Sequence, residues 1–222
     1  MKHAARLVPS RYVPAARTMK RSVSNAFAKS PLGAAVEAKK WADRCYDMPA
    51  PQMVKWSVLT RYGHPLGTWV ETGTYLGETT AFLAGSANHV YSLEPMPDLA
   101  QAAVERFGGI ANVTIIQGLS EDCLPEILDG IAGPVSFWLD GHFSKGNTFQ
   151  GPSDTPIRAE LAAIEPHLPR WDSVTVLVDD VRCFDPSNPN FADYPTRGWL
   201  VDWAERNNLN WLIEHDIFVA RR

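Results

Sequence analysis

The chain has 222 residues, of which 45% are hydrophobic and 21% are charged, as expected for one medium-sized globular domain with an extension. The net charge of −4 is uneven: residues 1–30 carry seven basic side chains and no acidic one, whereas the rest of the chain has a net charge of −11. Such an acidic domain is not typical of a nucleic-acid-binding protein, which usually presents a basic face, and no window holds the roughly 18 apolar residues of a transmembrane helix.

Residues 1–30 form a basic leader, which we expect to be flexible. Its arginines and serines loosely suit a targeting peptide, and weak contact with a membrane surface is a second alternative. The three cysteines, Cys45, Cys123 and Cys183, are few and widely spaced, without a CxxC metal signature. They favour a reducing compartment, so we expect a cytoplasmic protein.

The segments that follow predict a helical cap and then a Rossmann-like α/β domain. Helices are expected over 32–47 and 51–62, within a cap of residues 31–65. In the domain of residues 66–222, strands over 68–71, 89–93, 113–117, 135–139 and 174–178 alternate with helices over 79–85, 97–107, 121–131 and 155–168. This alternation predicts a mostly parallel sheet with helices on both faces and a ligand site at the carboxyl ends of the strands.

The end of the chain departs from this alternation. A helix is expected over 199–208, and two short apolar runs around a polar turn predict a β-hairpin over 211–220. An antiparallel hairpin is unusual in a dinucleotide dehydrogenase but is the ending expected of a methyltransferase-type sheet. Two long loops, 142–154 and 184–195, fall at the carboxyl edge, where long loops are often functional.

The first strand ends in the segment Glu71-Thr-Gly-Thr-Tyr-Leu-Gly77, which breaks at two glycines before a helix begins near Thr79. A strand, glycine turn and helix expose backbone N–H groups to a ligand, as in many nucleotide-type cofactor sites. Glu94 follows about 20 residues later, the spacing that a dinucleotide-binding domain also uses. The GxGxxG triplet of that rival class is absent, since only Gly73 and Gly77 are available.

These motifs resemble those of the class I S-adenosylmethionine-dependent methyltransferases over residues 66–222. The resemblance implies that the glycine turn holds the amino-acid part of the cofactor, that Glu94 accepts hydrogen bonds from the ribose, and that the segment from Gly118 lies against the adenine. The residues implied for cofactor binding are Glu71, Thr72, Gly73, Thr74, Gly77, Thr79, Glu94, Gly118, Ser120 and Asp140.

Three aspartates follow the fourth and fifth predicted strands: Asp140, Asp179 and Asp180. Carboxylates at one edge repel each other unless a cation or a proton intervenes, and oxygen ligands suit Mg²⁺ or another divalent cation. The arrangement is similar to that of the metal-dependent macrocin-type O-methyltransferases, which implies a metal on the three aspartates. His142 then stands where that family has an aspartate as catalytic base, and a neutral imidazole can also accept a proton.

Simpler roles remain open for these residues. Asp140 could bind the methionine ammonium alone, Asp179 and Asp180 could cap a turn, and His142 could be structural. We therefore expect a methyltransferase that acts on a hydroxyl of a small molecule or sugar with metal assistance, with Asp140 and His142 as catalytic residues. The alternatives are a metal-dependent hydrolase or hydroxylase and a non-catalytic binding module. The sequence leaves open both the identity of the acceptor and whether the chain forms a homo-oligomer.

Overall fold

The computed structural model describes residues 31–141 and 155–222, and the chain divides between Asp47 and Met48 into two units. In the first unit, helix α2 spans Pro31–Asp43, and the indole Nε1 of Trp41 donates to the carbonyl oxygen of Asp47 at 2.9 Å. The helix ends before the predicted residue 47 because Cys45 and Tyr46 adopt positive φ angles of 55° and 62°, which an α-helix cannot continue through. The predicted leader, residues 1–30, lies outside the described residues.

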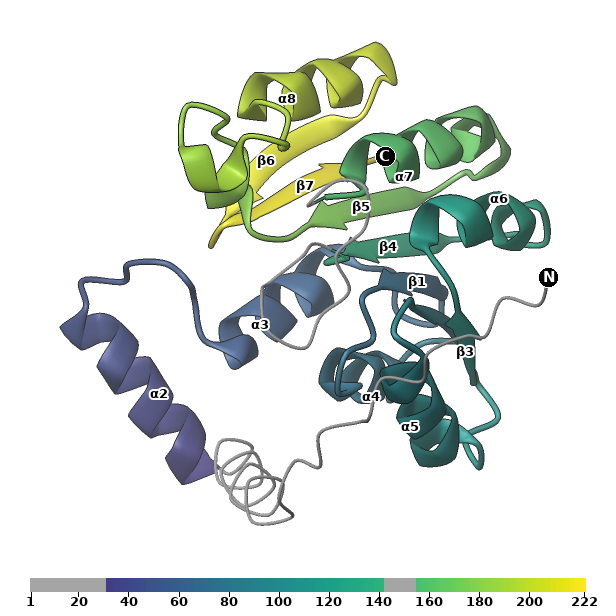
Figure 1. Cartoon of the computed structure of the whole chain (residues 1–222), viewed down its shortest axis with the longest axis horizontal. Helices are drawn as coiled ribbons and strands as arrows, with labels where there is room; N and C mark the ends of the chain where they lie inside the picture. The colour runs from purple at the N-terminus through teal and green to yellow at the C-terminus, as the bar shows by residue number, and fades with distance from the viewer. Residues whose placement is uncertain (1–30, 142–154) are drawn as a thin grey trace, which may run out of the picture. The chain divides into compact units, whose positions relative to one another are not determined.

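Seven strands in the second unit form one sheet, in the order β3-β2-β1-β4-β5-β7-β6 (Figure 1). Strands β1 to β5 run parallel to one another, and β7 runs antiparallel to both β5 and β6. The strands are β1 (Thr68–Thr72), β2 (His89–Glu94), β3 (Val113–Gln117), β4 (Val135–Leu139), β5 (Val174–Val178), β6 (Asn210–Glu214) and β7 (Ile217–Arg221). The predicted Rossmann-like methyltransferase fold with a terminal antiparallel hairpin is therefore confirmed.

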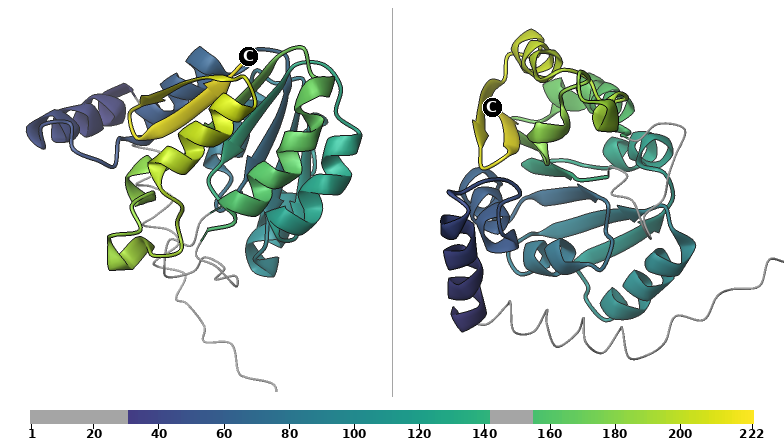
Figure 2. Two further views of the ribbon diagram at one scale, coloured as in Figure 1. Left: turned by 90° about the horizontal axis from the view of Figure 1, so that it is seen from above. Right: turned by 60° about the vertical axis from the view of Figure 1, so that its left-hand side comes forward.

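Helices cover both faces of this sheet (Figures 1 and 2). Buried side chains of α6, α7 and α8 form one core with residues such as Phe137 and Val176. On the other face, α3 and α4 pack against Trp138 and Leu177, and α5 packs against β2 and β3. The helices are α3 (Gln52–Tyr62), α4 (Glu78–Ala84), α5 (Pro97–Phe107), α6 (Ser120–Asp129), α7 (Ile157–Ile164) and α8 (Arg197–Arg206).

Strands β4 and β5 lie at the centre of the sheet, and every one of their residues is buried. Their sequences are nearly continuous apolar runs because both faces of a central parallel strand are covered by helices. Successive residues serve opposite cores, so that Phe137 and Trp138 point to different faces. These two strands set the position of the aspartates that follow them.

Helix α3 belongs to the second unit, where Val58 and Leu59 bury its inner face against the sheet. The predicted grouping of residues 31–65 into one helical cap stays a prediction, as do the boundaries at residues 30 and 65. Within the described residues, no helix is long and apolar enough to cross a membrane.

The loop between β5 and α8 holds two short 3₁₀ helices, η2 (Val181–Cys183) and η3 (Pro189–Phe191). Its aromatic rings pack on one another: Phe184 meets Tyr194 edge-on with centroids 5.3 Å apart, and Phe191 meets Tyr194 at 5.7 Å. This packing gives the loop a fixed course over the carboxyl edge of β5.

Candidate active site

The turn after β1 is closed tightly by its two glycines. Gly73 has a φ angle of +88°, and a Cβ atom there would lie 2.7 Å from the carbonyl oxygen of Asp140. Gly77 has a φ angle of +71°, and a Cβ atom there would lie 2.6 Å from the ring of Phe107. Both positions therefore require glycine, for backbone conformation and for space. The turn is held directly against the end of β4, as a cofactor site at the centre of the sheet would need.

Glu71, which we expected to bind the cofactor, lies beneath this turn and is only 1% exposed. Its Oε2 accepts hydrogen bonds from the hydroxyls of Thr80 at 2.5 Å and Ser92 at 2.6 Å. Burial raises the pKa of the Glu71 carboxyl to about 7, against the lowering effect of these two hydrogen bonds. Glu71 thus joins β1, β2 and α4 from within, and direct contact with a ligand stays a prediction.

Other predicted cofactor residues of the turn are also bonded within the fold. The hydroxyl of Thr74 is 2.6 Å from that of Ser92, and the hydroxyl of Thr79 accepts a hydrogen bond from Gln52 of α3 at 3.1 Å. The hydroxyl oxygen of Thr72 is buried and makes no hydrogen bond within residues 31–141 and 155–222. A Cβ atom on Gly141 would lie 3.1 Å from this oxygen, which places it beside the start of the segment after β4.

Glu94 stands at the end of β2, as predicted, and its carboxylate faces the glycine turn. Oε2 accepts the backbone N–H of Tyr75 at 2.7 Å, and Oε1 accepts that of Met96 at 3.0 Å. Two carboxylate oxygens offer about four acceptor positions, so further donors can still be accommodated. Glu94 is therefore placed where two hydroxyl groups of a ligand beside the turn could bind.

The third predicted cofactor segment meets Glu94 at the same edge. The backbone N–H of Gly118 donates to the carbonyl oxygen of Glu94 at 3.1 Å, directly after β3. Ser120 is the first residue of α6 and is 8% exposed. The structure thus brings the turn after β1 and the ends of β2 and β3 together along one edge.

The carboxylates predicted to bind a metal lie at the ends of β4 and β5, but a lysine lies among them. The Lys55 ammonium, from α3, forms an ion pair with Asp179 Oδ2 and lies 3.5 Å from Asp180 Oδ1. Asp140 is close enough to act electrostatically on both Lys55 and Asp179. The position of Lys55 was missed from the sequence, although it is the one charged residue in the first two turns of α3.

The charged side chains at this edge shift one another's pKa values. Burial, with repulsion from Asp140 and Asp180, raises the pKa of the Asp179 carboxyl, and Lys55 only partly opposes this. Burial lowers the pKa of the Lys55 ammonium, but the attraction of the three aspartates outweighs it, so the net shift is upward. Lys55 therefore keeps its charge, and the Asp179 carboxyl holds its proton more tightly than an ordinary aspartate does.

Arg182 supplies a second cation. Its guanidinium donates to Asp180 Oδ1 at 2.6 Å and forms an ion pair with Asp216 in the turn between β6 and β7. Asp216 Oδ1 also accepts the backbone N–H of Arg182 at 2.7 Å. Asp180 adopts a left-handed backbone with φ of 56°, which turns the chain sharply into η2. Asp180 thus has a structural role in the turn between β5 and η2.

These observations do not support the prediction of a divalent cation on Asp140, Asp179 and Asp180. In the part of the chain that the structure describes, no group of three or more His, Cys, Asp or Glu side chains could hold a metal ion. The physical reason is that Lys55 and Arg182 already neutralise two of the three expected ligands. His142, the predicted base, and the rest of the loop 142–154 lie outside the described residues.

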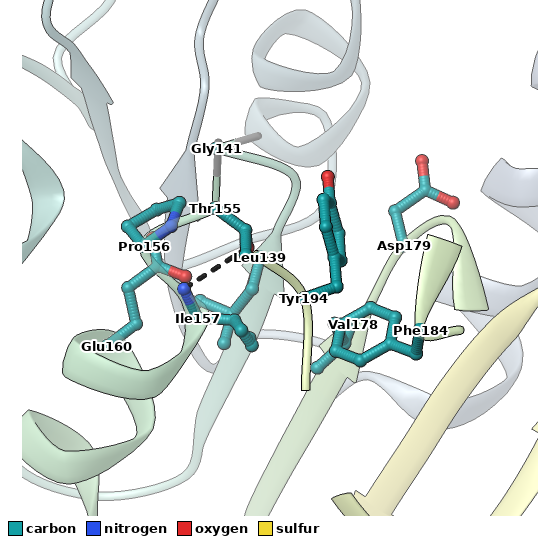
Figure 3. A pocket seen from close by; sticks show the side chains of 10 residues that line it. All are labelled: Leu139, Gly141, Thr155, Pro156, Ile157, Glu160, Val178, Asp179, Phe184 and Tyr194. Carbon is teal, nitrogen blue, oxygen red and sulfur yellow. Dashed lines mark hydrogen bonds between the residues drawn. The ribbon is translucent and has the colours of Figure 1, made fainter. Parts of the chain in front are cut away.

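A pocket opens next to this edge, between the ends of β4 and β5 and the start of α7 (Figure 3). Figure 3 shows the Tyr194 hydroxyl and the Asp179 carboxylate pointing the same way on one side, with Thr155 and Pro156 opposite. The lining residues are Leu139, Gly141, Thr155, Pro156, Ile157, Glu160, Val178, Asp179, Phe184 and Tyr194. Glu160, only 1% exposed on α7, was also missed from the sequence, because a carboxylate in an amphipathic helix usually faces solvent.

No protein-family model and no curated protein sequence matches this chain. Among solved structures, a proposed rRNA-methylase from Clostridium thermocellum is similar with a TM-score of 0.52 and 11% identity, over 79% of this chain and 97% of that one. N-methyltransferase NodS from Bradyrhizobium japonicum WM9 gives a TM-score of 0.49 and 12% identity, over 75% of this chain and 92% of that one. An rRNA methylase from Streptococcus thermophilus gives a TM-score of 0.47 and 16% identity, over 79% of this chain and 96% of that one. Such low identities establish the fold alone.

Proposed function

We propose that this protein is an S-adenosylmethionine-dependent methyltransferase that methylates a hydroxyl group of a small molecule or sugar. The observation that carries this proposal is the meeting of the glycine turn, Glu94 and Asp140 at one edge of the sheet. Gly73 packs on the backbone of Asp140, and Tyr75 of the same turn donates to Glu94. A cofactor with an amino acid at one end and a ribose at the other fits this order of groups.

The acceptor belongs in the pocket beside Asp179. That pocket adjoins the end of β4, so an acceptor there lies next to the methionine end of the proposed cofactor. Its aromatic wall, Phe184 and Tyr194, suits the flat apolar faces of a sugar or a small aromatic compound. The acidic character of the domain disfavours a nucleic acid, although two of the three similar structures named above are described as rRNA methylases.

Methyl transfer joins the acceptor oxygen to the methyl carbon and breaks the bond from that carbon to sulfur. The acceptor proton passes to a base, and the sulfonium becomes a neutral thioether. We propose His142 as this base and Asp140 as the residue that orients the methionine ammonium. The positive charge passes from the sulfonium to the base, and alignment of the two reactants supplies much of the acceleration. No metal is part of this proposal, since Lys55 and Arg182 stand at the carboxylates that would hold it.

Calorimetric titration of S-adenosylmethionine tests the cofactor site. We expect binding by the unchanged protein and a loss of about 10- to 100-fold in Glu94→Gln, because one charged acceptor for the ribose hydroxyls is removed. Glu105→Gln is the matched control: it makes the same change at an exposed residue of α5 that bonds only Gln101 among the described residues. Absence of binding by the unchanged protein would refute the proposal and favour a hydrolase, a hydroxylase or a non-catalytic module.

The acceptor class is tested with methyl-labelled S-adenosylmethionine and a panel of sugars and small phenols. We expect label in ether products that resist mild alkali. Label in amine products would keep the methyltransferase reaction and overturn the choice of a hydroxyl acceptor.

A further inference from the structure

A protein ammonium occupies the position at which the sequence predicted a metal ion. The Lys55 ammonium is paired with Asp179, whose side chain is 0% exposed, and the Lys55 side chain itself is 15% exposed. The same ammonium is 3.5 Å from Asp180, on the next residue of the chain. One cation thus serves both aspartates that follow β5, as a metal ion shared by the two would.

The position of this ammonium is set by the packing of α3. On one side of Lys55, Gln52 donates to the hydroxyl of Thr79 at 3.1 Å. On the other side, the ring of Trp56 stacks on that of Phe82 with centroids 4.9 Å apart and planes within 3°. Val58 then enters the core with 0% exposure. Lys55 is therefore held between fixed points rather than at the end of a free segment.

The neighbouring cation reinforces this arrangement from the other side. Arg182 binds Asp180 and Asp216, so that Asp180 lies between two positive side chains. A divalent ion on Asp179 and Asp180 would have to sit within hydrogen-bonding reach of Lys55 and be repelled by it. Metal and ammonium therefore compete for one place.

We propose that Lys55 is the resident cation of this edge, in place of a divalent metal ion, and that the edge becomes a divalent-cation site when Lys55 is removed. The unchanged protein then needs no divalent metal for stability at this edge. The proposal concerns the charge balance of the fold and holds whether or not the protein transfers methyl groups.

The test is thermal unfolding together with calorimetric titration of MnCl₂, with the full chain and no cofactor present. We expect that neither MnCl₂ nor chelator changes the Tm of the unchanged protein. Lys55→Ala lowers the Tm, because a buried carboxylate loses its partner. Saturating MnCl₂ then raises the Tm of Lys55→Ala by about 5 °C or more.

Three further variants make the result specific. Arg61→Ala removes a cation from the same helix, where Arg61 is 57% exposed and paired with Glu214, and should gain no manganese binding. Lys55→Arg keeps the charge and should behave as the unchanged protein does. Lys55→Ala combined with Asp179→Asn removes both charges and should lose the manganese response.

Lys55→Gln, which keeps an N–H donor for Asp179, takes the place of Lys55→Ala in these titrations if that variant does not fold. The proposal is overturned if the unchanged protein binds manganese as tightly as Lys55→Ala or Lys55→Gln does, and if the single substitution Asp179→Asn abolishes that binding. It is also overturned if neither Lys55→Ala nor Lys55→Gln shows manganese binding by calorimetry. Because the cofactor is absent throughout, failure of the proposed methyltransferase activity would leave these readouts unchanged.

Discussion

The buried carboxyl of Glu71 should make the stability of this protein depend on pH in a direction opposite to that of most carboxylates. Glutamine in the variant Glu71→Gln has the shape of the protonated acid and cannot ionise. In the folded protein, burial raises the Glu71 pKa from 4.5 to about 7. A shift of this size corresponds to about 3 kcal/mol between the two protonation states.

The sign follows from which state binds the proton more tightly. Because the folded pKa lies above the unfolded one, the folded state holds more protons between pH 4.5 and about 7. The contribution of Glu71 to stability is fully present below pH 4.5 and is lost as the pH rises through about 7. Above that value, the ionised group costs the folded state about 3 kcal/mol relative to its protonated form.

Urea unfolding at a series of pH values measures this contribution as a difference between Glu71→Gln and the unchanged protein. We expect the relative stability of the variant to rise by about 3 kcal/mol between acid and mildly alkaline pH. Asp179 titrates in an overlapping range but is present in both proteins, so the difference cancels it to first order. Glu105→Gln serves as the exposed control. A difference between Glu71→Gln and the unchanged protein that does not vary with pH would refute the reasoning.

Two further substitutions test the site. Gly73→Ala places a Cβ atom 2.7 Å from the carbonyl oxygen of Asp140 at a φ of +88°, so we expect a loss of 1–3 kcal/mol in urea unfolding, to order of magnitude, and weaker S-adenosylmethionine binding by calorimetry. An unchanged affinity for S-adenosylmethionine would contradict the placement of the cofactor against this turn. Tyr194→Leu removes one of the two rings of the aromatic wall of the pocket, so we expect kcat/KM for the acceptor to fall about tenfold with cofactor affinity intact. An equal loss of cofactor affinity would contradict the placement of the acceptor.

The sequence predicts three strands with their observed bounds: β3, β4 and β5. For the central strands β4 and β5 the reason is that a buried parallel strand is a short apolar run that ends at polar or turn residues. The acids at the end of β2 and directly after β4 and β5 could be placed at one edge of the sheet because parallel strands all end on the same side.

The missed features all depend on how distant segments pack. The local sequence does not show that Glu71 is buried. An acid at the end of a strand gives the same sequence pattern whether its carboxyl faces a ligand or two hydroxyl groups in the core. Lys55 stands on a helix whose pattern predicts only that it is amphipathic. Its meeting with Asp179 depends on docking of that helix against the end of a strand more than a hundred residues away.

The separation of 124 residues between Lys55 and Asp179 also bears on the order in which the protein folds. Closing so long a loop costs chain entropy that local pairings, such as the β6–β7 hairpin, do not have to overcome first. Until α3 docks, the aspartates after β4 and β5 repel one another, and among the described residues Arg182 is the cation that stays paired with Asp180. We therefore expect the carboxyl edge to be completed late, when the first helix of the unit closes against strands formed from the other end of the chain.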